Sequence, residues 1–328
     1  RDYYASRGLG DVYKRQGDES LSKRPMKRVI EPLTLMGAQI NSKDYKAPLE
    51  IFGKNLTGIN YNSKLASAQV KSCILLAGLN AEGKTSFTEP YISRDHTERM
   101  LKYMGANISA DKNTVTIEKS VLEPKTIEIC GDISSAAYFI AAGLIVPNSK
   151  IILKNVGLNP TRTGIIEVAV KMGGNIEILN KQTVSGEEVG DIQICYSELN
   201  ACTIEGEIIP KLIDELPVIA VIASQAKGTT IIKDAGDLRN KESDRIKAVV
   251  TELQKLGADI QETQDGSIIN GKKELKGDAE VETYHDHRLA MSLYVAGLIC
   301  KEPVLINGFE WVLSLIHISE PTRRVVIS

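Results

Sequence analysis

The sequence predicts an α/β protein built from repeated units, and three patterns along the chain support this prediction. An amphipathic run that ends in a glycine turn occurs four times, and nearly apolar segments alternate with those runs. A short β-branched run follows each apolar segment. Apolar spacing and glycine turns mark the ends of helices and strands. The alternation therefore predicts a unit of buried helix, strand, exposed helix, turn, and strand or hairpin, with three whole units and a half unit at each end.

The exposed helices are predicted from the turns that end them, in which Met or Leu precedes Gly, and Ile follows three residues after that Gly. The copies lie at residues 36–40, 104–108, 172–176 and 256–260. Glycine at the second position fits a left-handed C-cap before a strand. The clearest exposed helix is 246–256, whose apolar residues share one face, whereas Pro32 weakens or kinks the first one.

The buried helices are predicted at 67–78, 134–143, 214–223 and 286–297, because each segment is nearly apolar all round after a polar start. The β-branched runs after them predict strands at 84–88, 150–153, 229–233 and 304–306. Helix starts bind anions through free N–H groups, so several starts facing one cleft would bind a multiply anionic small molecule. Ordinary capping is the alternative at each single helix.

Composition limits the class of protein. The 328 residues predict about two domains at ~150 residues each, and the hydrophobic share of 42% excludes a disordered chain. The net charge of −2 argues against a protein that coats nucleic acid, and no apolar run reaches the ~18 residues of a membrane span. The five cysteines are scattered, so we expect reduced thiols in a cytosol-like, cytoplasmic compartment.

Both ends of the chain resemble translated sequencing adapter. The resemblance covers Arg7–Gln16 and Leu313–Arg323, and we therefore expect residues 1–16 and 313–328 to be non-native. A natural terminus is the alternative. If the segments are adapter, the chain is a fragment and His317 has no function.

Two short motifs suggest sites that their context argues against. Gly78–Thr85 matches the phosphate-loop pattern, but an apolar helix precedes it and Ser86–Pro90 cannot begin a helix. We therefore interpret it as a helix-to-strand turn. His285 and His287 suggest a metal site, but side chains two positions apart do not face together on a helix. We expect no metal there.

Charged residues gather in Lys241–Arg245, just before an exposed helix. On a helix, Lys241 and Glu242 would share a face with Arg245. A carboxylate held between cations can move a proton while the cations hold phosphate, whereas a solvated charge run is the alternative. Arginine near a helix start suits the capture of carboxylate and phosphate. The arginines near predicted helix starts are Arg24, Arg94, Arg245 and Arg288.

A set of longer motifs runs in order over residues 17–312. Its members are Gly17–Met26, Ser67–Ser72, Glu89–Leu101, Gly131–Ala137, Asn159–Gly164, Ile213–Pro217, Leu238–Arg245 and Asp286–Arg288. Together they resemble the 3-phosphoshikimate 1-carboxyvinyltransferase (EPSP synthase) family. The resemblance implies an α/β (α+β), two-lobed enolpyruvyl-transferase fold of βαβαββ units, incomplete at both ends, that closes around its substrates. The implied first lobe, about one and a half units, covers 17–130, and the second, nearly three units, covers 131–312.

The resemblance also implies an activity. The family transfers the enolpyruvyl group of phosphoenolpyruvate to the 5-hydroxyl of shikimate 3-phosphate and releases phosphate, in the shikimate pathway to chorismate and aromatic amino acids. It needs no organic cofactor, and its members are largely monomeric. We therefore expect two small-molecule substrates, a monomer, and no nucleic-acid or membrane partner.

Site residues follow from the resemblance. Those implied to bind phosphoenolpyruvate are Arg24, Arg245, Arg288 and, reaching both ligands, Gln69. Those implied to bind shikimate 3-phosphate are Ser67, Ala68 through its backbone, Gln69 and Arg94.

Three more residues carry implied catalytic roles. Asp214 would hold the 5-hydroxyl and accept its proton, and Glu242 would protonate the methylene carbon and later take a proton back. Lys241 would neutralise charge and contact the acceptor ring. A proton donor and a base beside fixed cations suit an addition that passes through a cationic centre and a tetrahedral ketal.

The chain also departs from the family pattern. The family's N-terminal Lys-Ser…Arg segment and its Asn-x-Gly-Thr loop have no counterpart, and after Trp311 its Ser-Phe-Pro stretch and C-terminal lysine are missing. We therefore expect the chain as given to be inactive or very weak. One alternative function is that of the sister transferase acting on UDP-N-acetylglucosamine. Another is a non-catalytic anion-binding protein on the same scaffold.

Overall fold

The computed structural model describes residues 12–15, 22–271, 274–314 and 325–327. The chain divides into two compact units, the first over Arg1–Ile127 and the second over Glu128–Ser328. The assignment of 17–130 and 131–312 to a partial and a nearly complete lobe stays a prediction, as does the non-native origin of the two ends. Most of 1–16 and 313–328, including His317, lies outside the described residues.

The first unit contains two sheets with helices packed beside them. Its elements are β1 (Val12–Arg15), α2 (Lys27–Leu35), β2 (Gln39–Lys43), β3 (Lys46–Phe52), β4 (Asn60–Asn62), α3 (Ala68–Gly78), β5 (Lys84–Thr88), α4 (His96–Tyr103), β6 (Ile108–Asp111) and β7 (Thr114–Glu118). The strand orders are β1-β3-β2 and β4-β5-β7-β6.

The second unit is larger and contains the main apolar core. Its elements are α5 (Ile133–Ile145), β8 (Lys150–Gly157), α6 (Gly164–Lys171), β9 (Asn175–Val184), β10 (Glu187–Cys195), β11 (Thr203–Ile204), η1 (Gly206–Ile208), α7 (Ile209–Leu212), α8 (Leu216–Ser224), β12 (Thr229–Ile232), η2 (Gly236–Asn240), α9 (Arg245–Lys255), β13 (Asp259–Glu262), β14 (Ser267–Asn270), β15 (Ala279–Glu282), α10 (His287–Gly297), β16 (Val304–Asn307), η3 (Phe309–Ser314) and β17 (Val325–Ile327). The strand orders are β8-β10-β9, β11-β12-β14-β13 and β15-β16-β17.

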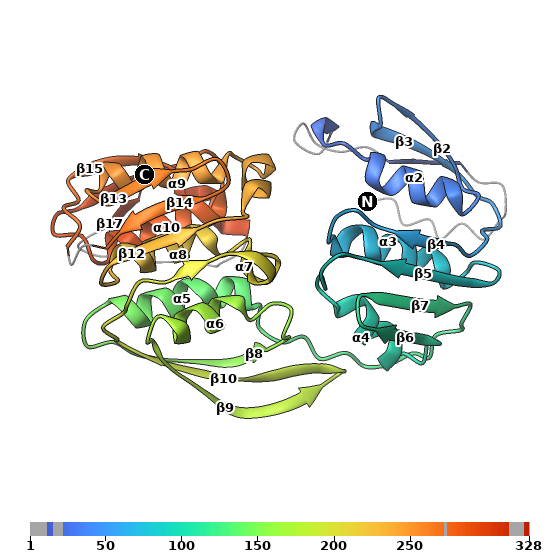
Figure 1. The fold of residues 1–328 in the computed structure, drawn as a ribbon, viewed down its shortest axis with the longest axis horizontal. Coiled ribbons are helices and arrows are strands. Elements are labelled where there is room, and N and C mark those ends of the chain that lie inside the picture. Colours follow the sequence, from blue (N-terminus) through green and yellow to red (C-terminus); the bar gives the residue numbers. More distant parts are fainter. Residues whose placement is uncertain (1–11, 16–21, 272–273, 315–324, 328) are drawn as a thin grey trace. The chain divides into compact units, whose positions relative to one another are not determined.

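One topology recurs in both units. In the first unit β4 and β5 pair in parallel around α3, and β7 pairs antiparallel with both β5 and β6. The second unit repeats this order with β11, β12, β14 and β13. In the β8-β10-β9 sheet, a parallel bridge from Gly131 to Val156 stands in for the first strand. These arrangements confirm the prediction of an α/β protein made of repeated units (Figure 1).

The glycine turns form as the sequence predicts. Gly37, Gly105, Gly173 and Gly257 have φ of 97°, 88°, 90° and 92°, and they follow α2, α4, α6 and α9. This left-handed conformation costs a residue with a Cβ free energy that glycine does not lose, which explains why the pattern requires glycine there. Helix α2 continues through Pro32 to Leu35.

The predicted buried helices are α3, α5, α8 and α10, and each begins within two residues of the prediction. All nine residues of α8 are buried, and α8 packs against α5 and α10. Burying a Val, Leu or Ile side chain contributes about 1.5–3 kcal/mol, so these helices hold the second unit together. In the phosphate-loop match, Gly83 has φ of 86° and β5 begins at Lys84, which confirms a helix-to-strand turn.

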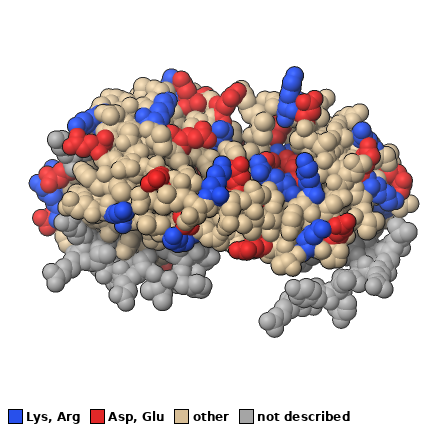
Figure 2. Space-filling view, turned by 90° about the horizontal axis from the view of Figure 1, so that it is seen from below, with Lys and Arg blue, Asp and Glu red and all other residues tan. Residues whose placement is uncertain are grey.

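Acidic and basic side chains are interspersed on the face that Figure 2 shows. This mixture agrees with the near balance of charges in the sequence. It differs from the contiguous basic stripe that marks a nucleic-acid surface.

Asp191 fastens an irregularity in β10, where the register shifts against both neighbouring strands. One carboxylate oxygen accepts from Lys154 Nζ at 2.7 Å and from Asn180 Nδ2 at 2.8 Å, and the other accepts from the Asn155 N–H at 3.0 Å. The hydrogen bond from Lys154, followed by those from Asn155 and Asn180, lowers the pKa of Asp191 from 3.8 to about 2. The folded chain therefore prefers an ionised Asp191.

We expect Asp191→Asn to lower the melting temperature at pH 7. A carboxyl whose pKa is depressed by folding stabilises the chain above its unfolded pKa, and this stabilisation is lost as the pH falls through the folded pKa. The difference from the parent should therefore shrink between about pH 4 and about pH 2, as measured by thermal denaturation. Asp111→Asn, at an exposed position on β6, serves as the control. A difference that stays constant over this pH range would contradict the assignment.

Candidate functional site

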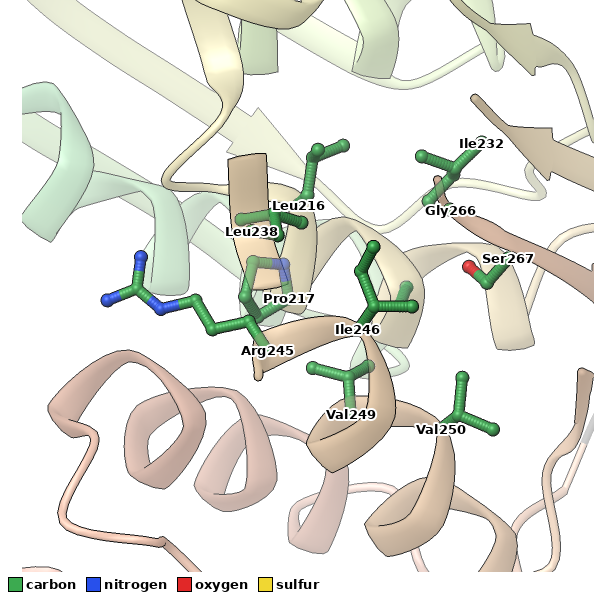
Figure 3. A pocket seen from close by; sticks show the side chains of 11 residues that line it. Leu216, Pro217, Ile232, Leu238, Arg245, Ile246, Val249, Val250, Gly266 and Ser267 are labelled. Carbon is green, nitrogen blue, oxygen red and sulfur yellow. The ribbon is translucent and has the colours of Figure 1, made fainter. Parts of the chain in front are cut away.

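Arg245 is the first residue of α9, and its guanidinium is buried among carboxylates. Its Nε donates to Asp286 Oδ2 at 2.7 Å, and its Nη2 donates to Glu242 Oε2 at 2.6 Å. Its Nη1 lies 3.4 Å from Asp214 Oδ1, and only 2% of the side chain is exposed. Figure 3 shows the guanidinium pointing away from the apolar side chains of Pro217 and Ile246. Such burial requires partners, because a buried charge without them is strongly destabilising.

Asp286 connects Arg245 to the start of α10. It is the N-cap of that helix and accepts from the Arg288 N–H at 2.9 Å, while its side chain has 0% exposure. Ser243 Oγ also donates to it at 3.1 Å. Burial would raise the pKa of Asp286, but the hydrogen bond and charge of Arg245 outweigh burial and lower it. Asp286 therefore stays ionised, and these hydrogen bonds reach both of its oxygens.

Asp214 faces several cations from different helix ends. It lies in the turn before α8, and its oxygens are 3.6 Å from Lys241 Nζ, 3.4 Å from Arg245 Nη1 and 3.8 Å from Arg288 Nη2. Asp214 and Arg288 are mostly buried, whereas Lys241 is about one-third exposed. The arrangement places a carboxylate and cations together at the starts of α8, α9 and α10.

Glu242 reaches Arg245 by a route that differs from the sequence interpretation. Residues 241–244 form a loop between η2 and α9, so the shared helical face expected for Lys241, Glu242 and Arg245 is wrong. Asp244 instead caps α9 by accepting from the Lys247 N–H at 3.1 Å. The loop still brings Glu242 against Arg245 while leaving 36% of the Glu242 side chain exposed. Among these carboxylates, Glu242 is the one that solvent reaches most.

Arg288 also lies beside Glu215, the residue that directly precedes α8. Glu215 is buried, and its Oε1 accepts from Ser134 Oγ and lies 3.7 Å from Arg288 Nη1. Ser134 also accepts from Arg162, which pairs with Asp132 at 3.2 Å. Burial raises the pKa of Glu215, against the opposing effect of the Ser134 hydrogen bond. Sequence analysis did not assign a role to Glu215; its signal was a carboxylate beside a wholly apolar helix.

The remaining predicted site residues lie in the first unit. Ser67 precedes α3 in an extended conformation, and within the described residues its side chain makes no capping hydrogen bond. Ala68 and Gln69 form the first turn of α3, and Gln69 is exposed. Arg94 is half-buried just before α4. The first turn of a helix offers N–H groups to an anion, so this turn fits the expected binding of a phosphorylated acceptor.

Arg24 is exposed and lies shortly before α2. Residues 17–21 of the predicted Gly17–Met26 motif lie outside the described residues. The structure thus groups Asp214, Lys241, Glu242, Arg245 and Arg288 within the second unit. The predicted set in the first unit is Arg24, Ser67, Ala68, Gln69 and Arg94.

Sequence analysis also missed a buried ionic group in the first unit. Lys71, in the second turn of α3, has 1% side-chain exposure and pairs with Glu89 at 2.9 Å and with Glu98 at 2.8 Å. Its Nζ also donates to the backbone oxygen of Ser93 at 3.1 Å. The available signal was a lysine inside an otherwise apolar helix, which must find a partner when it is buried.

We expect Arg245→Met to lower the free energy of unfolding by about 3–5 kcal/mol, because it leaves Asp286 buried without its cation. Chemical denaturation of the purified chain measures this loss. Lys233→Met is the control, since Lys233 pairs with Glu205 at 3.1 Å on the surface. An exposed pair contributes about 0–1 kcal/mol. Equal losses in the two variants would show that the Arg245 cluster does not hold the fold.

Among the described residues, no group of three or more His, Cys, Asp and Glu side chains is arranged to hold a metal ion. No described helix combines the length and the apolar character of a membrane span.

Comparison with known proteins identifies the family. The family described as EPSP synthase (3-phosphoshikimate 1-carboxyvinyltransferase) matches residues 10–313. The 3-phosphoshikimate 1-carboxyvinyltransferases of Bacillus velezensis and Bacillus subtilis are 52% and 53% identical over 309 residues, which is 93% of this chain and 71% of each relative. A solved EPSP synthase from Acinetobacter baumannii is 42% identical with a TM-score of 0.84, covering 92% of this chain and 71% of its own. The chain therefore belongs to the EPSP synthase family.

Proposed function

We propose that the site of this chain serves the transfer of the enolpyruvyl group of phosphoenolpyruvate to the 5-hydroxyl of shikimate 3-phosphate with release of phosphate, in the shikimate pathway to chorismate and aromatic amino acids, and we still expect the turnover of the chain as given to be absent or very weak. Membership of the EPSP synthase family supports the reaction. The observation that carries the residue assignment is the cluster around Arg245, where a partly exposed and a mostly buried carboxylate meet one guanidinium. Such a group supplies proton transfer and anion binding at one place.

Arg245 and Arg288 are the proposed anchors for phosphoenolpyruvate. Its phosphate and carboxylate each offer pairs of oxygens that match the fork of a guanidinium. Arg245 is held at a fixed position by Asp286, and Arg288 lies beside Glu215. Cations fixed in advance stabilise charge without reorganising during the reaction. Arg24 and Gln69, the other residues that the resemblance implies for this substrate, lie in the first unit.

Asp214 and Glu242 divide the proton transfers in the proposed reaction. Asp214 accepts the proton of the 5-hydroxyl while the hydroxyl oxygen bonds to C2 of phosphoenolpyruvate. Glu242 donates a proton to the methylene carbon. The tetrahedral ketal then loses phosphate, which leaves with the proton that Asp214 took, and Glu242 takes a proton back from the methyl carbon to restore the double bond. Lys241, 3.6 Å from Asp214, offsets the negative charge beside the acceptor ring.

In the proposed site, phosphoenolpyruvate and Glu242 share one cation. The anion approaches Arg245, whose Nη2 already lies 2.6 Å from Glu242 Oε2. A nearby negative charge disfavours the ionised form of a carboxyl. Glu242 is also the more exposed carboxyl, so a proton can reach it from solvent.

In the first unit, Ser67, Ala68, Gln69 and Arg94 are the proposed partners of shikimate 3-phosphate. The support is the open first turn of α3 and the half-buried Arg94 that precedes α4. A monomeric state, a cytoplasmic location and the absence of an organic cofactor stay predictions.

The acceptor test compares shikimate 3-phosphate with UDP-N-acetylglucosamine in the presence of phosphoenolpyruvate. We expect calorimetric binding with shikimate 3-phosphate only, and any phosphate release to occur with this acceptor alone and at a very low rate. Binding and turnover with the UDP-sugar instead would establish the sister activity. Binding of both phosphorylated acceptors with similar affinity, without phosphate release from either, would indicate an anion-binding protein.

We expect Glu242→Gln to lower the residual kcat of the chain by about 100-fold or more, the size of a general acid–base contribution. The affinity for shikimate 3-phosphate should stay within about twofold, because glutamine keeps the shape of the side chain. Glu262→Gln is the matched control, since Glu262 pairs with Arg239 at 2.8 Å and lies on β13. Steady-state kinetics and calorimetry measure both quantities. An active Glu242→Gln enzyme would remove Glu242 from the mechanism.

A further inference from the structure

The buried Lys71 is more than an ion pair, because its partners hold one short segment of backbone. Glu89 Oε1 accepts from Lys71 Nζ at 2.9 Å and also from the Ser93 N–H at 2.8 Å. Lys71 Nζ in turn donates to the Ser93 carbonyl at 3.1 Å. Both backbone polar groups of Ser93 are therefore held by the two members of one buried pair.

This backbone clamp acts on the residue directly before Arg94. The peptide between Ser93 and Arg94 carries the carbonyl that Lys71 holds, so the clamp sets the direction in which the chain leaves for Arg94. Ser93 itself is buried, and its Oγ has no hydrogen-bond partner among the described residues. The placement of this segment therefore relies on its backbone contacts.

The clamp also joins this segment to the start of α3. Lys71 lies one helical turn after Ser67, and Ser72 Oγ forms a 2.6 Å hydrogen bond with Thr97 Oγ1 in α4. The turn that carries Ala68 and Gln69 and the segment that carries Arg94 are thus parts of one packed body. Groups that bind one small molecule must keep fixed relative positions, because misplacement by about 1 Å can cost a large factor in rate.

We propose that Lys71 and Glu89 are positioning residues that hold Ser93 and Arg94 against the first turn of α3 and so order the groups that bind the acceptor. This inference rests on the proposed function for the identity of the acceptor. It does not depend on that function for the ordering of the segment itself.

Glu98 provides a matched comparison within the same ionic group. Its Oε1 lies 2.8 Å from Lys71 Nζ, as close as Glu89, but no hydrogen bond to the Ser93 backbone is among its described contacts. Burial raises the pKa of Glu98, against the opposing hydrogen bond and charge of Lys71. Removing either carboxylate leaves Lys71 with one carboxylate partner, but only the loss of Glu89 frees the Ser93 N–H.

The experiment compares Glu89→Met, Glu98→Met and Glu89→Gln in the full chain. Amide hydrogen exchange over residues 91–95 measures the ordering without ligand, and calorimetry with shikimate 3-phosphate measures binding. We expect Glu89→Met to speed exchange in this segment by about tenfold and to weaken binding by about tenfold. Glu98→Met should leave the exchange rate and the affinity within about twofold of those of the unaltered chain, while its melting temperature is similar to that of Glu89→Met. Glu89→Gln keeps an acceptor for the Ser93 N–H, so its exchange rate and its affinity should be close to those of the unaltered chain.

The outcomes separate the clamp from the proposed function. Unchanged exchange in Glu89→Met, or equal changes in Glu98→Met, would overturn the clamp. Faster exchange with unchanged affinity would overturn its role in binding. If the unaltered chain does not bind shikimate 3-phosphate, the proposed acceptor is wrong, and faster exchange in Glu89→Met alone still supports the ordering of the segment.

Discussion

The site in the second unit depends on the burial of the Arg245 guanidinium. A cation with 2% exposure holds its place only if carboxylates surround it, and Asp286, Asp214 and Glu242 do so from three different segments. Each carboxylate is therefore located by the same charge. The polar cluster is thereby an internal part of the fold, because neither the cation nor its most buried partner tolerates the loss of the other.

The repeated topology explains how segments far apart in the chain supply this cluster. Buried helices α8 and α10 pack side by side and α9 lies next to both. The side chains at or just before their first residues, Asp214, Arg245 and Asp286, consequently meet. The first unit uses the same device on a smaller scale, since α3 and the segment before α4 meet through Lys71. Repetition of one unit thus presents helix starts to neighbouring helix starts, where N–H groups and formal charges reinforce one another.

Local pattern was enough to predict the repeated elements. Gly105 and Gly173 occupy left-handed turns because helix ends impose that conformation, and the all-buried α8 follows from its composition. The sites depend on contacts between distant residues, which periodicity does not encode. Glu242 meets Arg245 through a loop rather than along a helix, because Asp244 is the N-cap and α9 begins only at Arg245. The partners of Lys71 lie 18 and more residues further along the chain. The lysine in an apolar helix therefore indicated a buried cation but not which residues it contacts.

Asp286 serves two structures at once, as the cap of α10 and as the anchor of Arg245. Its Oδ1 accepts from the Arg288 N–H and also from Arg245 Nη2, while its Oδ2 accepts from Arg245 Nε, so neither duty can be adjusted without disturbing the other. Heat inactivation and the fraying of α10 should consequently proceed as a single event. A selection for tolerance to warmer growth would then tend to spare this residue and act on the surrounding apolar packing instead.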